Sequence, residues 1–320
     1  VFVIDICYKT SFDKLERVQE FINKKLPKLS NKLYLFKGDI RDQNLLEGIF
    51  KKAIKIDKKI NAVIHLAGLK SVYESINDPL TYWDNNLCGA ISLLKVMNLN
   101  NCNIIVFSSS ATIYDTSKNE LIKEDENIKP INPYGKNKVA IESFLQDIYN
   151  SNKNIWKIAN LRYFNPVGAH PDGIIGEDSK GDASNLFPNI IQVAKGHRKF
   201  INVYGNDWPS KDGTCIRDYV HVMDLADGHI KALNYLFSNN HKLINLNLGS
   251  GIGKSVLEVI KTFEEINSVK IPYLFANRRE GDRSRVIADI ELSKKILKWE
   301  PIYSLSDMCR DAWNWDKLIN

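Results

Sequence analysis

The chain has 320 residues, of which 44% are hydrophobic and 26% are charged, with a formal net charge of +6 at pH 7. This length and apolar content suit a globular protein of one large or two medium domains and exclude an intrinsically disordered chain. No apolar run reaches the roughly 18 residues of a membrane span, and the amino terminus lacks a secretory pattern, so we expect a cytoplasmic protein.

Cysteine and histidine give no support for a metal site. The five cysteines are widely spaced without a Cys-x-x-Cys pair, and we interpret them as reduced thiols. The six histidines are also scattered, so we expect no metal. The positive charge comes from lysines interleaved with acids, which is typical of a solvated surface, and no nucleic-acid recognition motif accompanies it.

Residues 1–6 form an apolar run that carries Asp5 near its end, which predicts a buried parallel strand with a carboxylate at its carboxyl end. In dinucleotide-binding folds such an acid binds the ribose hydroxyls of NAD, about 20 residues after a glycine-rich turn. Residues 249–253, Gly-Ser-Gly-Ile-Gly, imitate that turn. Their third glycine comes one residue early and no acid-ended strand follows at the right distance, so we interpret them as a tight turn.

Ala67 and Gly68 follow another strand, and they let the backbone come close to a cofactor because neither side chain intrudes. We interpret the preceding His65 as a packed histidine. The first third of the chain also predicts an exposed helix over 14–25, strands over 33–36 and 62–66, and a long helix from Asp78-Pro79 through Asn98.

Residues 104–110, Ile-Ile-Val-Phe-Ser-Ser-Ser, predict a buried strand with three hydroxyls at its carboxyl end, where open α/β sheets place ligands. Asn132-Pro133 then predicts the start of a helix, with the asparagine as cap. Tyr134 and Lys138 share one face of that helix, and an ammonium beside a phenol lowers the phenol pKa from about 10 toward neutrality. A Ser, a Tyr and a Lys in this order suit hydride transfer assisted by a general base.

The chain contains 13 tyrosines and three Tyr-x-x-x-Lys pairs. Tyr114 to Lys118 and Tyr149 to Lys153 have the composition of loops or helix ends, whereas the pair at Tyr134 opens a helix. We therefore choose Tyr134 as the reactive residue and expect Phe at either of the other two tyrosines to be almost silent.

After Pro166 the composition shifts to Gly, Pro and Asp, which predicts a second domain built of shorter elements. Asn185 and Leu186 begin a predicted helix whose amino end could receive a diphosphate. Arg217 and Arg279 are candidate partners for its oxygens, since a guanidinium fork binds phosphate in bidentate fashion.

Several motifs in this order resemble the extended short-chain dehydrogenase/reductases and, within them, the UDP-galactose 4-epimerase family, over the whole chain. They are Ile64-His65-Leu66-Ala67-Gly68-Leu69-Lys70, Ser108-Ser109-Ser110-Ala111-Thr112, Tyr134-Gly135-Lys136-Asn137-Lys138, Leu161-Arg162-Tyr163-Phe164-Asn165-Pro166-Val167-Gly168-Ala169-His170, Arg217-Asp218-Tyr219-Val220-His221-Val222 and Arg278-Arg279-Glu280-Gly281-Asp282.

The resemblance implies an α/β fold with a doubly wound, Rossmann-type, mostly parallel sheet and a smaller carboxyl-terminal α/β substrate domain. Residues 1–166 would form the NAD-binding domain and 167–320 the UDP-sugar-binding domain, with about 218–237 returning to the first. Family members carry a first strand, a Gly-x-x-Gly-x-x-Gly turn and a helix before the position of Val1. We therefore expect the chain as given to lack them and, expressed alone, to be aggregated or unable to hold NAD. The family also implies a homodimer, formed through the helix after Asp78 and the Tyr134 helix.

The implied activity is interconversion of UDP-galactose and UDP-glucose by transient oxidation at C4 of the hexose, with NAD as cofactor. Tyr134 would take the O4 proton, Lys138 would keep the phenolate accessible, and Ser110 would hydrogen-bond the reacting oxygen. The residues implied at the cofactor are Asp5, Asp39, Ile40, Leu66, Ala67, Gly68, Lys70, Asn86, Ser108, Tyr134, Lys138 and Phe164.

The resemblance also implies a set of substrate contacts. In the family, the residue four past the Asp of Arg-Arg-Glu-Gly-Asp borders the C2 substituent of the sugar, and a bulky Tyr there excludes N-acetyl groups. Val286 holds this position here, so we expect UDP-N-acetylglucosamine to be accepted. The implied substrate residues are Lys70, Ser110, Tyr134, Asn165, Asn185, Leu186, Asn202, Val203, Tyr204, Arg217, Arg279, Asp282 and Val286.

Two alternatives remain open from the sequence. A dehydratase or decarboxylase of the same superfamily would act on another nucleotide sugar, but dehydratases typically follow the Ser or Thr with an Asp-Glu pair, where this chain has Ala111-Thr112. A non-catalytic NAD-binding regulator often loses the Tyr or the Lys, and both are present here. A product assay with UDP-galactose distinguishes all three.

Overall fold

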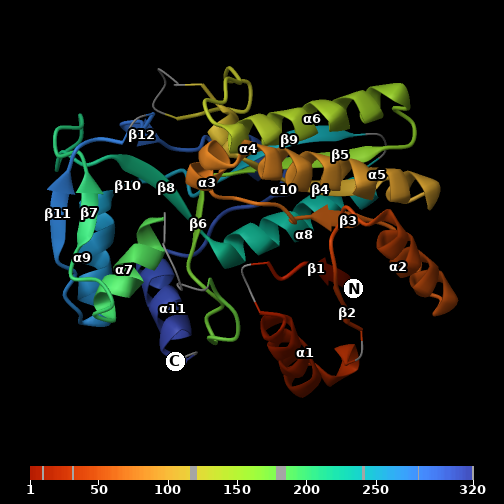
Figure 1. The fold of residues 1–320 in the computed structure, drawn as a ribbon, viewed down its shortest axis with the longest axis horizontal. Coiled ribbons are helices and arrows are strands. Elements are labelled where there is room, and N and C mark those ends of the chain that lie inside the picture. The colour runs from red at the N-terminus through yellow and green to blue at the C-terminus, as the bar shows by residue number, and fades with distance from the viewer. Residues whose placement is uncertain are drawn as a thin grey trace. The chain divides into compact units, whose positions relative to one another are not determined.

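The computed structural model describes residues 1–8, 11–30, 32–115, 121–177, 185–239, 242–279 and 281–318 (Figure 1). The chain divides into two compact units, each built from segments that are distant in sequence. The first unit consists of Val1–Ile113, Pro130–Asn160 and Ala232–Ile244, and the second of Tyr114–Lys129, Leu161–Lys231 and Asn245–Asn320.

These boundaries differ in three places from those predicted from the sequence. Tyr114–Lys129, expected in the first domain, belongs to the second unit. The change expected after residue 166 falls before Leu161, and the returning segment, expected at about 218–237, is Ala232–Ile244. The reason is strand β8 (Ile216–His221), which pairs with β6, β10 and β12 of the second unit. Those pairings keep the start of the following helix in the second unit.

Parallel strands dominate the first unit, as the sequence predicts. β1 (Phe2–Asp5) pairs in parallel with β2 (Tyr34–Lys37), and β3 (Val63–His65) pairs in parallel with β4 (Ile104–Ser110). β1 is half-buried along its whole length rather than fully buried as expected. In its two-stranded sheet only one of its edges is hydrogen-bonded to a neighbour, so the side chains have less cover.

A four-stranded sheet of order β3-β4-β5-β9 continues from β3 and β4. Its strands β5 (Lys157–Tyr163) and β9 (Leu243–Leu248) begin in the first unit and end in the second. β4 is nearly continuously buried, as an apolar strand covered on both faces should be.

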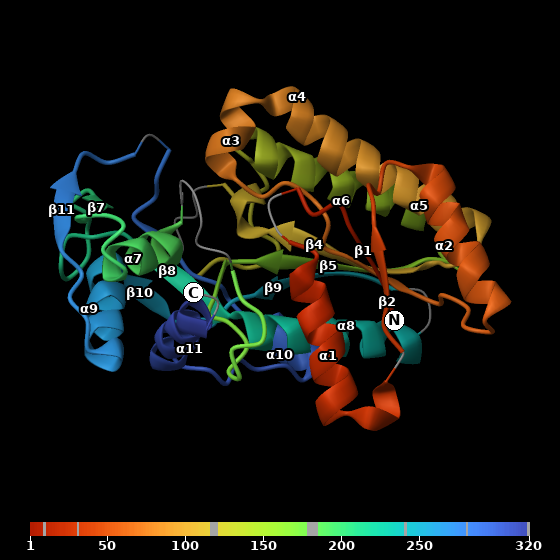
Figure 2. The same ribbon diagram turned by 60° about the horizontal axis from the view of Figure 1, so that its bottom comes forward.

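Helices α2 (Gln43–Lys55), α5 (Gly89–Leu99) and α6 (Pro133–Ser151) pack with β4 in the hydrophobic core of the first unit. Figures 1 and 2 both show α5 and α6 lying side by side. By contrast α1 (Asp13–Lys25) buries no residue, as predicted for an exposed helix. The buried core residues include Leu46, Phe50, Leu94, Met97, Ile105, Phe107, Ile141, Leu145 and Ile158.

The helix predicted after Asp78 is present but contains an irregular turn. The Asp78 carboxylate accepts a hydrogen bond from Thr81 N over 3.2 Å and caps α4 (Pro79–Tyr82). A π-helical turn, η2 (Trp83–Cys88), then leads into α5. Such turns are frequent at functional sites, and Asn86 lies within this one.

Among its described residues, the second unit contains two further sheets. Around β8 are β6 (Asn165–Val167), β10 (Gly253–Ser255) and β12 (Arg285–Val286), while β7 (Ile201–Tyr204) pairs in parallel with β11 (Tyr273–Ala276). In the part of the chain that the structure describes, no helix is both long and apolar enough to cross a membrane. The longer helices here are α7 (Leu186–Ala194), α8 (Val222–Ser238, ending in the first unit), α9 (Val256–Asn267), α10 (Glu291–Leu297) and α11 (Leu305–Leu318).

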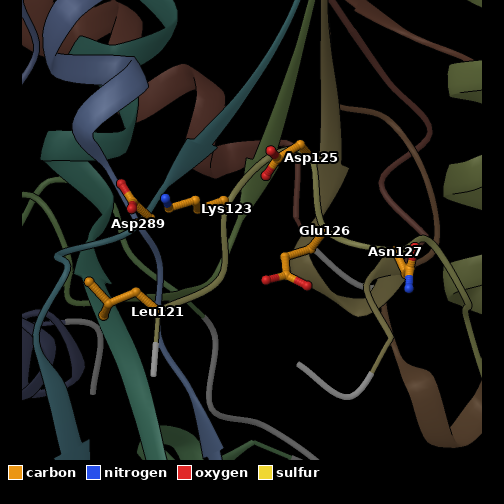
Figure 3. A pocket seen from close by; sticks show the side chains of 6 residues that line it. All are labelled: Leu121, Lys123, Asp125, Glu126, Asn127 and Asp289. Atoms are coloured by element: carbon orange, nitrogen blue, oxygen red, sulfur yellow. The ribbon is translucent and has the colours of Figure 1, made fainter. Parts of the chain in front are cut away.

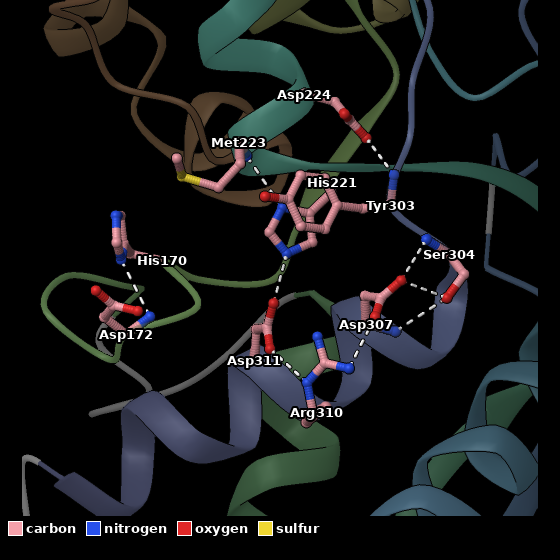
Figure 4. Close-up of polar contacts among 10 residues, drawn as sticks. All are labelled: His170, Asp172, His221, Met223, Asp224, Tyr303, Ser304, Asp307, Arg310 and Asp311. Atoms are coloured by element: carbon pink, nitrogen blue, oxygen red, sulfur yellow. Dashed lines mark hydrogen bonds and ion pairs between the residues drawn. The ribbon is translucent and has the colours of Figure 1, made fainter.

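Buried polar contacts attach α11 to the end of β8 (Figure 4). His221 Nδ1 accepts a hydrogen bond from Met223 N over 3.0 Å, so the neutral imidazole carries its proton on Nε2. Nε2 lies 3.3 Å from the buried Asp311 carboxylate, to which Arg310 Nε donates over 2.9 Å. Burial lowers the pKa of His221, although the Asp311 carboxylate opposes this. The pair is therefore a neutral imidazole held against a carboxylate.

Gly168, just after β6, must be glycine because of this imidazole. Its φ of +87° lies in the left-handed region, and a Cβ there would approach His221 Nε2 to 2.7 Å. Both the conformation and the space exclude a side chain.

We predict that Gly168→Ala lowers the free energy of unfolding by about 2 kcal/mol or more, because it adds a strained φ and a clash with a buried ring. Gly196→Ala is the control for strain, since Gly196 also has a positive φ (+74°) but nothing within 4 Å of its added Cβ. Gly48→Ala in α2, also without a neighbour, should stabilise by up to about 1 kcal/mol. Urea unfolding followed by circular dichroism measures all three. Equal losses for residues 168 and 196 would show that His221 does not matter.

Candidate active site

The end of β4 and the first turns of α6 carry the predicted Ser, Tyr and Lys, all within the first unit. Lys138 Nζ donates a hydrogen bond to Ser108 O over 2.7 Å and lies 5.6 Å from the centre of the Tyr134 ring. The Ser110 hydroxyl hydrogen-bonds the Tyr134 phenol. The structure therefore brings together four residues that the sequence analysis selected.

Local sequence explains why α6 begins just before Tyr134. Pro133 is its first residue, and Asn132 Oδ1 caps it by accepting from Gly135 N over 2.8 Å. Ser75 of α3 (Val72–Asn77) accepts from Tyr134 N over 3.2 Å. A Cβ on Gly135 would lie 2.9 Å from Thr112 O, so glycine lets the helix start approach the end of β4.

Burial controls the charges at this site. It lowers the pKa of Lys138 to about 8, with the Glu142 carboxylate opposing, and it raises the pKa of Tyr134, with the Ser110 hydroxyl opposing. The expectation that Lys138 brings the Tyr134 pKa toward neutrality is wrong for this structure. The cost of burying a phenolate is the largest cause of the Tyr134 shift, and the Lys138 ammonium is bonded to Ser108 O instead.

The three serines that end β4 have different partners. Ser108 offers its carbonyl to Lys138, while Ser109 Oγ donates to Glu142 Oε1 over 2.5 Å. Ser110 Oγ accepts from Thr112 N over 3.2 Å and from Thr112 Oγ1 over 3.0 Å, which leaves its own proton for Tyr134. The sequence analysis missed Glu142, although its spacing of four from Lys138 on one helix was a visible signal.

The other two Tyr-x-x-x-Lys pairs lie elsewhere. The Tyr114 hydroxyl, in the second unit, is buried, donates to Asn247 Oδ1 over 2.5 Å and accepts from Arg162 Nη1 over 3.0 Å. Lys118 lies outside the described residues. Tyr149 lies near the carboxyl end of α6. Tyr114→Phe would break a buried network, so it is not the silent control that we expected.

The loop after β3, implied at the cofactor, is held by Asn86. Its Oδ1 accepts from Leu69 N over 2.7 Å, and its Nδ2 donates to Leu69 O over 3.1 Å. Gly68, with φ +154°, precedes Leu69, and Lys70 follows it with its side chain exposed, as is that of Leu66. Asn86 is buried, so its side-chain amide holds the backbone of this loop from the interior of the protein.

The acids implied at the cofactor lie at the ends of β1 and β2. Asp5 Oδ1 accepts from Cys7 N over 2.6 Å. The Arg41 guanidinium binds the Asp39 carboxylate and holds its pKa below the usual value. Ile40 is buried against Gly89, where a Cβ would lie 2.7 Å from Ile40 Cδ1, so its backbone rather than its side chain is available to a ligand.

In the second unit, both predicted arginines have partners. Arg217 forms an ion pair with Asp282, and the Arg279 guanidinium lies 3.8 Å from the centre of the Tyr204 ring. In the parallel β7–β11 pair, Tyr204 lies opposite Ala276, the last residue of β11, and the segment that follows Ala276 contains Arg279. The charges of Arg217, Asp282 and Arg279 all act on the pKa of Cys215, so these groups gather around one place.

The remaining substrate candidates are also in the second unit. Asn165 Nδ2 donates to Asp218 O over 2.8 Å, and Asn185 caps α7 without a side-chain hydrogen bond to the helix. Val286 is half-buried and lies beside Arg217 in the β12–β8 register. Asn202 is exposed.

Three of the predicted residues have packed side chains. Val203 is 1% exposed in the core of the second unit, so only its backbone can contact a ligand. Leu186 packs against the same core, and Phe164 is buried with its N–H donating to Leu248 O over 3.2 Å.

The glycine-rich turn after β9 binds a carboxylate of its own chain. Asp218 Oδ1 accepts from Ser250 N over 2.6 Å and from Ser250 Oγ over 2.7 Å. Asp218 Oδ2 accepts from Gly251 N over 2.9 Å and from Ala288 N over 3.1 Å. The amides that imitate a phosphate cradle are thus occupied by Asp218, as expected for a tight turn. Through Ala288, the carboxylate also holds the chain after β12.

A surface depression in the second unit is lined by three carboxylates and no predicted site residue (Figure 3). Negative charges of this density would repel a diphosphate, so the depression does not suit a nucleotide sugar. Within the described ranges, no group of three or more His, Cys, Asp or Glu could hold a metal ion. The lining residues are Leu121, Lys123, Asp125, Glu126, Asn127 and Asp289.

Comparison with known proteins gives consistent matches. Residues 1–312 match the family model described as GDP-mannose 4,6 dehydratase. UDP-glucose 4-epimerase 1 of Oryza sativa subsp. japonica is 48% identical over 288 residues, which are 89% of this chain and 80% of that protein.

Solved structures agree with these matches. The UDP-glucose 4-epimerase of Stenotrophomonas maltophila, with bound NAD and formylated UDP-arabinopyranose, is 38% identical with a TM-score of 0.92 and covers 100% of this chain and 91% of that one. The enzyme of Bifidobacterium longum, in complex with NAD+ and UDP, is 40% identical with a TM-score of 0.89 over 99% of this chain and 91% of that one.

We predict that Asp218→Asn lowers the free energy of unfolding by about 2 to 5 kcal/mol. Each carboxylate oxygen accepts two donors, so either orientation of an amide turns its NH₂ against two of them. Asp57→Asn is the control, because Asp57 is exposed and its φ of +56° is one that Asn tolerates. Denaturant unfolding measures both, and similar midpoints would contradict the role assigned to Asp218.

Proposed function

This chain belongs to the UDP-glucose 4-epimerase family of the extended short-chain dehydrogenase/reductases, and we propose that it interconverts UDP-galactose and UDP-glucose. The observation that carries the proposal is the contact of Tyr134 with the Ser110 hydroxyl beside the Lys138 ammonium. A general base, a hydrogen-bond donor and a positive charge are what the removal of a proton from a sugar hydroxyl requires.

In this proposal Tyr134 Oη takes the proton from O4 of the hexose and later returns it. Ser110 donates to the phenol oxygen and stabilises the phenolate, because Thr112 already donates to Ser110 Oγ and orients it. Lys138 supplies the positive charge, fixed in place by Ser108 O.

The residues of the first unit fit NAD as the cofactor. The Asp5 carboxylate at the carboxyl end of a parallel strand suits ribose hydroxyls, and the Lys138 ammonium stands beside the proposed base. Asn137 Nδ2 is buried without a partner among the described residues, a donor that a bound amide or hydroxyl oxygen would satisfy. When bound, NAD would accept hydride from C4 and return it, and its nicotinamide charge would counter the effect of burial on Tyr134.

We assign the remaining cofactor contacts to the loop after β3 and the backbone at Ile40, and the UDP-sugar contacts to the second unit. Arg217 and Arg279 would bind the diphosphate, Tyr204 with the β7 backbone would contact the nucleotide, and Asn165 would contact the hexose. The first unit would thus be the NAD-binding domain and the second the UDP-sugar-binding domain.

We further propose a cytoplasmic homodimer that uses the outer faces of α5 and α6. The exposed Leu80 (81%) and Leu99 (70%) at the two ends of the α4–α5 stretch support an apolar contact there. Sedimentation velocity on the purified chain tests the dimer, and a monomer at micromolar concentration would contradict it.

An epimerase is favoured over a dehydratase by the two residues after Ser110. Water loss needs an acid that can protonate a leaving hydroxyl. Ala111 has no such group, and the Thr112 hydroxyl is committed to Ser110. A product assay with UDP-galactose separates the two activities.

We predict that, in a complete chain, Tyr134→Phe reduces turnover of UDP-galactose by several orders of magnitude while UDP-sugar binding stays nearly unchanged, because the variant loses a proton acceptor and little contact area. Tyr149→Phe is the matched control at the other end of the same helix and should keep turnover within about twofold. Coupled assay of UDP-glucose and calorimetry with UDP measure the two quantities. Near-normal turnover of Tyr134→Phe would refute the assignment.

We predict measurable epimerisation of UDP-N-acetylglucosamine by a complete chain, reduced sharply by Val286→Tyr while UDP-galactose turnover is largely kept. One larger wall residue typically changes acceptance by about 1 to 3 kcal/mol. The neighbouring Arg283 side chain is not free to fill the space that a Tyr at position 286 would occupy, since it donates to the carbonyls of Tyr114 (2.6 Å) and Asp115 (2.9 Å). Val286→Ala, the control, should keep both activities. Normal UDP-galactose turnover without N-acetyl activity in the parent would contradict the prediction.

A further inference from the structure

Two successive residues of β4 bind two residues that lie one turn apart on α6. Ser108 O accepts from Lys138 Nζ over 2.7 Å, and Ser109 Oγ donates to Glu142 Oε1 over 2.5 Å. Lys138 is 5% exposed and Glu142 8% exposed, so both charged groups are buried. Their spacing of four places them on one face of the helix, in line with Tyr134.

A buried ammonium needs a counter-charge, because desolvation otherwise drives it to its neutral form. The groups around Lys138 come from three elements: Tyr134 and Glu142 on α6, the Ser108 carbonyl and Phe107 ring on β4, and His65 on β3. Burial and the Lys138 charge lower the pKa of His65 to about 3, so this imidazole is neutral. Tyr134 is protonated at neutral pH because burial raises its pKa. Glu142 supplies the carboxylate.

We propose that Glu142, held by Ser109, is a positioning residue that supplies the counter-charge of the buried Lys138 ammonium and thereby extends the Tyr134–Lys138 pair to a row of three. The proposal rests on the function assigned above to Tyr134 and Lys138. Ser109 matters because its hydroxyl satisfies one carboxylate oxygen and so fixes where the negative charge lies.

The protonation of Lys138 determines in which direction pH affects turnover at this site. The charged form of Lys138 is fully present below its pKa of about 8 and is lost as pH rises through that value. Glu142 raises this pKa, so replacing it with a neutral residue lowers the pH at which the ammonium is lost. Turnover that needs the ammonium should fail at correspondingly lower pH.

The experiment compares Glu142→Gln with Glu47→Gln, a control that removes the same charge from an exposed helical ion pair of the first unit. Lys138 is titrated by NMR of side-chain-labelled lysine, assigned with Lys138→Met. We expect its titration midpoint to fall by about one pH unit or more in Glu142→Gln and to stay unchanged in Glu47→Gln. This readout needs no turnover, so it holds even if the chain acts on another substrate.

The pH profile of UDP-galactose turnover, measured in a complete chain, is the second readout. Its alkaline limb should move to lower pH in Glu142→Gln, with about tenfold less turnover above pH 8 and little change in KM at pH 6. A merely structural role would lower turnover equally at every pH. An unmoved Lys138 titration in Glu142→Gln would overturn the proposal, whereas a shifted titration in a chain inactive on UDP-galactose would overturn only the substrate assignment.

Denaturant unfolding keeps the test decisive if Glu142→Gln is poorly stable. Glu142→Gln should lower the unfolding midpoint of the parent but raise that of Lys138→Met, because in the latter the buried carboxylate no longer has a nearby ammonium to offset its charge. Ser109→Ala, which keeps the Glu142 charge but removes the hydrogen bond from Ser109, should give a smaller shift of the Lys138 titration than Glu142→Gln. Equal effects of Glu142→Gln in both backgrounds would contradict the pairing.

Discussion

The hydrogen bond from the buried Lys138 ammonium to Ser108 O is the interaction on which the organisation of the first unit depends. It requires the start of α6 to meet the end of β4 at short range, and several residues serve that approach. Pro133 and Asn132 start the helix at the required residue. Gly135 has no side chain that would clash with Thr112 O, and Ser75 Oγ accepts a hydrogen bond from Tyr134 N in the first turn. The charge chemistry of the site depends on how much water this packing removes.

The second unit is organised around a buried charge of the opposite sign. The four donors that meet the Asp218 carboxylate come from the turn after β9 and from the chain after β12. Since Asp218 follows Arg217 on β8, this carboxylate fixes the strand that presents the arginine and, through Ala288, the segment that carries Val286. Burial of this carboxylate is tolerated because each oxygen accepts two hydrogen bonds.

Several residues that the resemblance implies at the cofactor or the substrate have side chains that pack against the protein itself. Asn86 binds the backbone of Leu69, Ile40 packs on Gly89, and Val203 lies in the core. A family resemblance therefore also selects residues whose side chains hold the backbone of a site in place. Whether a side chain contacts a ligand or a loop is decided by its burial and partners.

The sequence by itself determined much of this protein. It predicted strands over 1–6, 33–36, 62–66 and 104–110, which the structure has as the parallel strands Phe2–Asp5, Tyr34–Lys37, Val63–His65 and Ile104–Ser110. It also predicted a helix capped by Asn132 and a tight turn at 249–253. These are local properties: apolar runs, cap residues and helical spacing act within a few residues and are readable in order. For the same reason Tyr134 could be chosen among three Tyr-x-x-x-Lys pairs, since only it opens a helix.

Only the tertiary structure decided the charges, the irregular turn and the unit boundaries. The direction of the Tyr134 pKa shift depends on desolvation, which no spacing reveals, and the Ser109–Glu142 bond joins residues 33 positions apart. The π-helical turn around Asn86 and the assignment of residues 216–221 to the second unit likewise result from packing and from strands distant in sequence. Burial and long-range partners are set by how elements pack, so the sequence could select the reactive groups but not state how they are charged.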